Sequence, residues 1–219
     1  MRYPFVLFDL DGTLIDSARD LVASVQHAFQ KVDRREPPDA ADILALVGSP
    51  LEKFPPALGY PSDPANLTLF ADTYRAHYAE HFNDHTKLYP GIEGMLSALK
   101  VAGAKLALVT TKHQAQADFT ARECGLLAWL DHVHGWREDR KHKPDPEPVR
   151  LALEALGGAP GQALMVGDSE LDIEAGRAAG VATCAVGWGF RPAWLLKEYC
   201  PDFLVGAARD IVDIVLGPR

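Results

Sequence analysis

The sequence predicts an α/β protein in which helices cover both faces of a parallel β-sheet. Short apolar runs alternate with amphipathic helical segments along residues 89–186, a pattern typical of parallel strands joined by helical crossovers. Residues 16–88 contain helical patterns and no convincing strand, which indicates a helical insertion. Several of the apolar runs end in polar residues, as strands do at the ligand-binding edge of open α/β sheets.

The first strand and the insertion follow from local signals. Residues 3–8 form an apolar run that stops at Asp9, which favours a buried strand. Asp16-Ser17 then supplies a helix cap, with apolar residues recurring at helical spacing behind it. Further helices are expected around residues 40–47, 51–58 and 64–82. Three aromatic residues at helical spacing are interpreted as core of the insertion: Phe70, Tyr74 and Tyr78.

The alternation of strands and helices begins after Tyr89-Pro90-Gly91. Strands are expected at residues 105–110, 133–136, 163–166 and 181–186. Helices are expected at residues 92–102, 113–124, 146–156 and 170–179. We therefore expect a Rossmann-like α/β core domain from residues 1–15 and 89–219, with residues 16–88 forming a helical cap domain inserted after the first strand.

Composition excludes several classes of protein. The chain has 219 residues, 47% of them hydrophobic, and a formal net charge of −8. That length suffices for one core and a small second domain. An acidic chain lacks the basic surface that nucleic acids or anionic membranes require. The three cysteines are widely spaced without a CxxC pair, and residues 1–10 resemble neither a signal peptide nor a membrane span, so a cytoplasmic location is expected.

Polar residues follow three of the predicted strands. They are Asp9 with Asp11, Thr110 with Thr111, and Asp168 with Asp172. Because the carboxyl ends of parallel strands meet at one edge of a sheet, these side chains are expected in one crevice. Purely structural roles explain these residues equally well, since Asp-Gly is a common turn pair and acidic residues and threonine often cap helices.

Chemistry favours a magnesium site among these carboxylates. Clustered carboxylates repel each other unless a cation joins them, and ligand sets made only of oxygen favour Mg²⁺ over zinc. Lys143 lies in a stiff proline-rich loop that can hold its ammonium group in place. Thr110 can bind a phosphoryl oxygen through its hydroxyl or cap the following helix.

Four motifs in this order resemble the haloacid dehalogenase superfamily over nearly the whole chain. The first is Asp9-Leu10-Asp11-Gly12-Thr13-Leu14 after a hydrophobic strand. The others are Thr110 after an apolar strand, Lys143-Pro144, and Gly167-Asp168-Ser169 with Asp172. The position of the insertion resembles the helical-cap branch of the family, and Val47 to Leu51, with Gly48 and Ser49, looks like its substrate-specificity loop. A plain helix–helix turn explains that loop equally well.

The resemblance implies a magnesium-dependent phosphohydrolase. Asp9 would attack phosphorus, and Asp11 would protonate the leaving group and later activate water. The metal would be held by Asp9, the backbone carbonyl of Asp11 and Asp168, with Asp172 supporting the metal shell or Lys143. Thr110 and Lys143 would stabilise the phosphoryl oxygens, while Gly12, Thr111, Gly48 and Ser49 would contact the substrate.

Several alternatives remain open within the resemblance. Dehalogenases of the superfamily lack an acid at the position of Asp11, so phosphate esters or anhydrides fit better. Aromatic segments such as Trp188 to Arg191 look most like bacterial phosphoglycolate phosphatases, which makes 2-phosphoglycolate the first substrate expected. Thr111 stands where close relatives often carry asparagine. A pyrophosphatase, a sugar-phosphate mutase, an imine-forming hydrolase using Lys31 or Lys53, and a non-catalytic binding protein are the competing hypotheses. The expected partner is a small phosphorylated metabolite, and the expected state a monomer or homodimer.

Overall fold

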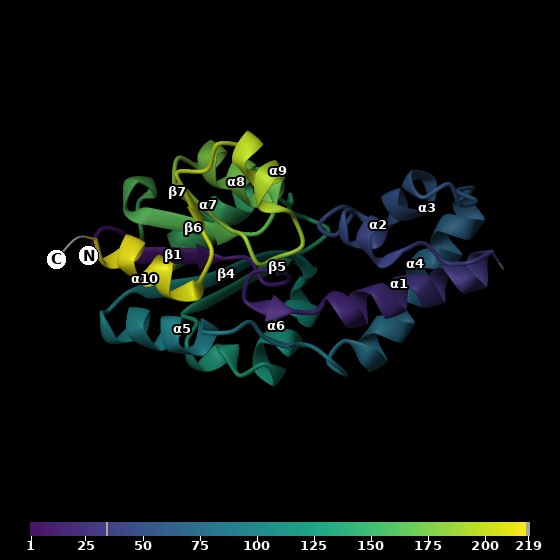
Figure 1. The fold of residues 1–219 in the computed structure, drawn as a ribbon, viewed down its shortest axis with the longest axis horizontal. Helices are drawn as coiled ribbons and strands as arrows, with labels where there is room; N and C mark the ends of the chain where they lie inside the picture. The colour runs from purple at the N-terminus through teal and green to yellow at the C-terminus, as the bar shows by residue number, and fades with distance from the viewer. Residues whose placement is uncertain (34, 218–219) are drawn as a thin grey trace. The chain divides into compact units, whose positions relative to one another are not determined.

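The computed structural model describes residues 1–33 and 35–217 (Figure 1). Arg34 and residues 218–219, which belong to the predicted domains, lie outside the described residues. The chain divides into two compact units, Met1–Asp16 with Leu88–Arg219 and Ser17–Lys87. Two short strands, β2 (Ile15–Asp16) and β3 (Lys87–Leu88), pair where the chain passes from one unit to the other and back.

The first unit contains a six-stranded sheet of described residues in the order β5-β4-β1-β6-β7-β8, with every pair parallel. Its strands are β1 (Phe5–Phe8), β4 (Lys105–His113), β5 (His132–Trp136), β6 (Ala163–Gly167), β7 (Ala182–Val186) and β8 (Phe203–Val205). In the centre, Phe5 of β1 pairs with Lys105 of β4 on one side and Ala163 of β6 on the other. This register brings the ends of three strands to the same level.

Helices cover both faces of this sheet. Val6 and Phe8 pack with residues of α5 (Ile92–Val101) and α10 (Ala208–Leu216). Leu7 instead packs with residues of α7 (Glu147–Ala155) and α8 (Glu170–Ala179). Figure 1 shows these two helix pairs on opposite sides of the strands. Alternate residues of β1 thus point into two buried clusters, as a strand in the middle of a covered parallel sheet requires, and the predicted fold class is confirmed.

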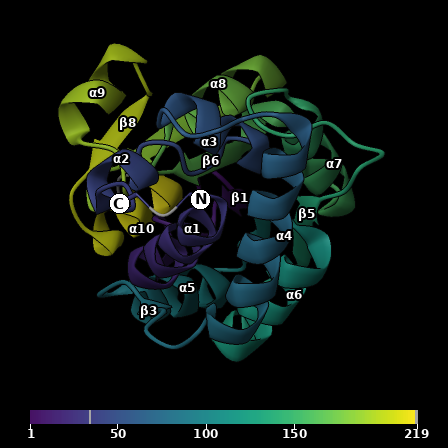
Figure 2. The same ribbon diagram turned by 90° about the vertical axis from the view of Figure 1, so that its right-hand side faces the viewer.

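The second unit is helical. It consists of α1 (Ala18–Val32), α2 (Ala40–Leu44), the 3-10 turn η1 (Leu51–Lys53), α3 (Phe54–Ala57) and α4 (Pro64–His81). Figure 2 shows α1 beside α4. The ring of Phe29 on α1 lies 4.7 Å from that of Phe70 on α4, centroid to centroid. Phe70, Tyr74 and Tyr78 are all buried, which confirms that they are core residues.

The structure departs from the predicted elements at several places. The helix predicted at 40–47 ends at Leu44, and β3 lies within residues 16–88, where no strand was expected. The strand predicted at 105–110 continues to His113, with a register shift against β5 between Val109 and His113. The helix predicted at 51–58 is divided between Lys53 and Phe54 into η1 and α3, with Pro55 and Pro56 in the first turn of α3. Three elements follow the last predicted strand: α9 (Ala193–Glu198), β8 and α10.

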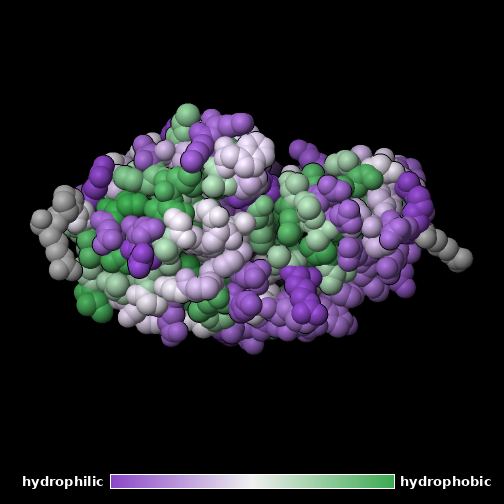
Figure 3. Space-filling model, viewed as in Figure 1, coloured by the Kyte–Doolittle hydropathy of each residue, from purple (hydrophilic) through white to green (hydrophobic). Residues whose placement is uncertain are grey.

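No helix among the described residues is long and apolar enough to cross a membrane. On the face seen in Figure 3, both units show hydrophobic as well as hydrophilic residues. The three cysteines form no disulfide: Cys184 is buried, Cys124 half-buried and Cys200 exposed.

Candidate active site

The sheet brings three of the predicted strand ends side by side. Asp9 follows β1, Thr110 lies in β4, and Asp168 follows β6, and these are neighbouring strands in the order β4-β1-β6. The backbone N–H of Asp9 donates to the carbonyl of Val166 at 2.9 Å, which extends the pairing of β1 and β6 by one step. All three residues are buried.

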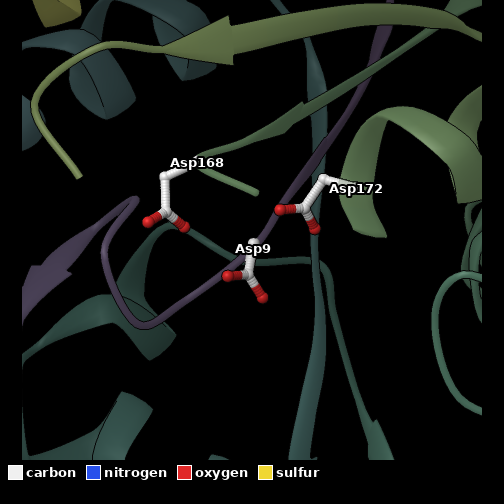
Figure 4. A group of neighbouring side chains, drawn as sticks. All are labelled: Asp9, Asp168 and Asp172. Carbon is white, nitrogen blue, oxygen red and sulfur yellow. The ribbon is translucent and has the colours of Figure 1, made fainter. Parts of the chain in front are cut away.

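Three carboxylates form a compact buried cluster. One oxygen from each of Asp9, Asp168 and Asp172 lies within 4.8 Å of the others. Figure 4 shows the three side chains approaching one another from the end of β1, the end of β6 and the first turn of α8. Such a set of oxygen donors fits a hard divalent cation such as Mg²⁺.

The pKa shifts of the cluster also favour a bound cation. Burial raises the pKa of Asp9 from 3.8 to about 7, with Asp172 and Asp11 adding to the rise and Lys143 opposing it. Burial, followed by the charges of Asp9 and Asp172, raises the pKa of Asp168 well above its ordinary value. Burial and mutual repulsion therefore disfavour the ionised form of these carboxylates, and a bound cation would relieve both effects.

Lys143 connects two members of the cluster directly. Its Nζ donates to Asp9 Oδ1 at 2.7 Å, to Asp172 Oδ1 at 2.5 Å and to the carbonyl of Val109 at 2.9 Å. Burial alone would lower the pKa of Lys143, but the carboxylates of Asp172 and Asp9 outweigh it and raise that pKa. Lys143 therefore stays a fixed ammonium ion in a buried place.

Asp172 combines a local role with a role in the cluster. Its Oδ2 accepts hydrogen bonds from the backbone N–H and the hydroxyl of Ser169 at 3.1 and 2.6 Å, completing a capping box on α8. Its Oδ1 accepts from Lys143. Asp172 is thus both a helix-capping residue, as the sequence allowed, and the residue that holds Lys143 beside Asp9.

Asp168 is held by two loops. Its Oδ2 accepts from the N–H of Phe190 at 2.7 Å, and its Oδ1 accepts from the hydroxyl of Thr13 at 3.3 Å. The indole N–H of Trp188 in turn donates to the carbonyl of Thr13 at 3.1 Å. The sequence does not predict these supporting contacts, because nothing in the spacing of the residues shows that residue 188 lies beside residue 13.

Because Gly12 has no side chain, the carboxylate of Asp168 can lie directly against its backbone. Its φ is +84°, and a Cβ built on it would lie 2.2 Å from Asp168 Oδ2. Both the left-handed backbone and this close approach require glycine. Gly12 is therefore fixed by the geometry of the carboxylate cluster.

Asp11 forms an ion pair that the sequence analysis did not anticipate. Lys112 Nζ lies 3.2 Å from Asp11 Oδ1 and 3.1 Å from Oδ2. The backbone N–H of Lys112 also donates to Thr110 Oγ1 at 3.1 Å. Because β4 continues to His113, Lys112 lies two residues beyond Thr110 on the same strand. Residues two apart on a strand point to the same face, so the spacing of Thr110 and Lys112 would have predicted this contact if the strand had been expected to continue beyond Thr110.

The other residues predicted to contact the substrate are Thr111, Gly48 and Ser49. Thr111 is half-buried in β4 beside Thr110. Gly48, with φ of +94°, and Ser49 lie in the second unit between α2 and η1. In the same unit, Lys31 and Lys53, the two candidates for an imine-forming lysine, are exposed.

Comparison with known proteins decides the family. The family model for haloacid dehalogenase-like hydrolases matches residues 6–186. This chain belongs to the haloacid dehalogenase-like hydrolases. The match contains Asp9, Asp11, Lys143, Asp168 and Asp172.

Relatives of this haloacid dehalogenase-like hydrolase carry two different names. A pyrophosphatase PpaX from Bacillus velezensis is 34% identical over 217 residues, covering 97% of this chain and 96% of the relative. A phosphoglycolate phosphatase from Aquifex aeolicus is also 34% identical, over 218 residues that cover 96% and 95%. The solved structure of a haloacid dehalogenase-like family hydrolase from Streptococcus pneumoniae has a TM-score of 0.87 at 25% identity, covering 97% of this chain and 98% of that one. The chain is thus an enzyme of a hydrolase family whose named relatives act on phosphate compounds.

Proposed function

We propose that this phosphatase hydrolyses a small phosphorylated metabolite with the help of Mg²⁺, and that the reaction passes through a phosphoryl group bound to Asp9. The observation that carries the proposal is the contact of Lys143 Nζ with both Asp9 and Asp172, next to Asp168. A buried nucleophile between an ammonium ion and a cation-binding cluster matches what phosphoryl transfer requires, which is positioning and charge neutralisation.

Asp9 supplies the nucleophilic oxygen. Lys143 binds its Oδ1, so we assign the attack on phosphorus to Oδ2. The new bond joins this oxygen to phosphorus while the bond from phosphorus to the leaving oxygen breaks. Lys143 and the hydroxyl of Thr110 are assigned to the oxygens of the transferred group, whose charge is shared among them in the transition state.

We assign the proton transfers of both steps to Asp11. It donates a proton to the leaving oxygen in the first step and accepts one from water in the second, when that water attacks phosphorus and releases phosphate from Asp9. Its carboxylate is held by Lys112 at 3.1 and 3.2 Å, at the strand end next to Asp9. The two carboxylates thereby divide the roles of nucleophile and acid–base.

The carboxylates of Asp9 and Asp168, with the backbone carbonyl of Asp11, are assigned to hold Mg²⁺. When bound, the ion neutralises negative charge on the phosphoryl oxygens. Asp172 supports this arrangement through Lys143, since both of its oxygens already accept hydrogen bonds from Lys143 and Ser169.

The first substrate we propose is 2-phosphoglycolate, and the second candidate is inorganic pyrophosphate. The names of the relatives from Aquifex aeolicus and Bacillus velezensis support one each. Both compounds are small anions and carry a second negative group besides the phosphoryl group that is transferred. The helical unit 17–87, with Gly48 and Ser49, is proposed to act as the cap that selects the substrate.

A screen of phosphorylated metabolites tests the proposal. The purified protein is assayed with Mg²⁺ against 2-phosphoglycolate, pyrophosphate and a set of sugar phosphates, ranked by kcat/KM. We expect 2-phosphoglycolate or pyrophosphate at the top of the ranking. Turnover of a bis-phosphorylated sugar as a mutase, or no turnover of any compound, would contradict the proposal.

A further inference from the structure

Two lysines serve this site, and they contact different carboxylates. Lys143 Nζ contacts Asp9 and Asp172, which places it beside the phosphoryl group in the proposed reaction. Lys112 Nζ contacts both carboxylate oxygens of Asp11. Positive charge at this site is therefore divided between two positions, the nucleophile and the acid–base.

The side chain of Lys112 is mostly buried, so its positive charge is weakly screened by water. Its side chain is 5% exposed and that of Asp11 is 12% exposed. Its own backbone N–H is bonded to Thr110 Oγ1, which fixes the start of the side chain. A charge this far from bulk water acts on a neighbouring anion much more strongly than a surface lysine does.

The side on which Lys112 lies follows from the role of Asp11. An acid that protonates the leaving oxygen must lie within hydrogen-bond reach of it. Lys112 Nζ lies 3.1 Å from that acid, so it lies next to the leaving group. The transferred phosphoryl group already has Lys143, Thr110 and the cation-binding cluster.

We infer that Lys112 recognises a second negative charge, carried by the leaving group of the substrate. This inference rests on the proposed function and narrows it. The substrates are phosphoryl compounds whose leaving group is itself an anion: a short carboxylate, as in 2-phosphoglycolate, or a phosphate, as in pyrophosphate. Lys112 is then a specificity-determining residue, in addition to its contact with the acid.

A matched pair of substrates tests this inference. 2-Phosphoglycolate and ethyl phosphate differ in having a carboxylate or a methyl group at the end of the leaving group. The kcat/KM for each is measured with Mg²⁺ in the wild type and in Lys112→Met, and the ratio of the two values is compared. Pyrophosphate and methyl phosphate form a second pair for the same comparison.

We expect the preference for the anionic leaving group to fall at least about tenfold in Lys112→Met, mainly through KM for the anionic substrate. Lys112→Arg keeps the charge and should retain most of the preference. Lys112→Gln is a second neutral variant in case Lys112→Met does not fold. The matched control is Lys100→Met, which removes a lysine paired with Asp131 at 2.7 Å, near the start of β4, and should leave the preference unchanged.

Equal losses on both members of each pair would overturn the inference, because Lys112 would then act only by holding Asp11. A loss of preference in Lys112→Arg as large as in the neutral variants would overturn it as well. Failure of the proposed function looks different: the wild type itself would then turn over none of the four compounds.

Discussion

At the scale of single residues, the site depends on carboxylates that are buried close together. The pKa of Asp9 is raised to about 7 by burial, and that of Asp168 is raised in the same direction. A raised pKa means that the folded protein without metal binds protons at these carboxylates at pH values where free aspartate is already ionised. Protons and Mg²⁺ then compete for the same oxygens.

Magnesium affinity is therefore expected to increase with pH. Below about pH 7, where Asp9 is protonated, each decrease of one pH unit should lower the apparent Mg²⁺ affinity about tenfold, because one proton competes with the metal. The affinity should level off only where Asp9 and Asp168 are both ionised before the metal binds, since the pKa of each is raised. Isothermal titration calorimetry with Mg²⁺ between pH 5.5 and 8.5 measures this dependence, and a constant affinity over the range would refute it.

Gly12 allows a second test at this scale. In Gly12→Ala the new Cβ meets Asp168 at 2.2 Å, on a backbone with φ of +84°. Gly157→Ala is the matched control, because Gly157 has φ of +72° and nothing within 4 Å of the added Cβ. We expect the control to cost about 1 kcal/mol of folding stability for the left-handed backbone, with normal activity.

Gly12→Ala should cost more stability than Gly157→Ala and should also weaken Mg²⁺ binding, because Asp168 must move. Urea unfolding gives the stability difference, and calorimetry gives the metal affinity. Equal stability losses together with unchanged Mg²⁺ affinity would show that Asp168 does not need the space above Gly12.

At the scale of elements, the loop after β7 positions Asp168 from a distance in the sequence. The Phe190 N–H bonds Asp168 directly, and Trp188 Nε1 bonds the carbonyl of Thr13, whose hydroxyl reaches Asp168. Trp188→Phe removes only the indole N–H. We expect the Mg²⁺ concentration for half-maximal activity to rise several-fold, with a smaller change in kcat at saturating Mg²⁺.

The matched control for that change is Trp136→Phe, which removes an indole N–H bonded to the carbonyl of Arg140 at 3.1 Å, the same length as the bond of Trp188. It should leave the Mg²⁺ dependence as in the wild type. Identical behaviour of the two variants would mean that the Trp188 bond stabilises the fold without positioning Asp168.

The elements also show what the sequence could and could not predict. Strands β1, β4, β5, β6 and β7 follow from their apolar runs, and the convergence of Asp9, Thr110 and Asp168 follows from the rule that parallel strand ends meet. The β8 strand is only three residues long, too short for periodicity to reveal. Lys112 was missed because its polar surroundings hid the continuation of β4, and ion pairs across 101 residues leave no local signal.

At the scale of the whole molecule, the residues proposed for the chemistry belong to one unit. Every residue we assign to catalysis or metal binding lies in the unit made of residues 1–16 and 88–219. The family match spans both units.

Removing Mg²⁺ with EDTA should stop turnover and adding excess Mg²⁺ should restore it. Activity that persists in EDTA would refute the metal role of the carboxylate cluster.

The most direct test of the account is to trap the phosphoryl group on Asp9. Asp11→Asn removes the carboxylate that we assign to the activation of water, while p-nitrophenyl phosphate needs no proton for its leaving group to depart. The variant is mixed with this substrate and Mg²⁺, quenched with acid, digested and analysed by mass spectrometry. We predict a phosphoryl group on Asp9, and none in the double variant that also carries Asp9→Asn. A phosphoryl group on another residue, or one that forms as well without Asp9, would contradict the account.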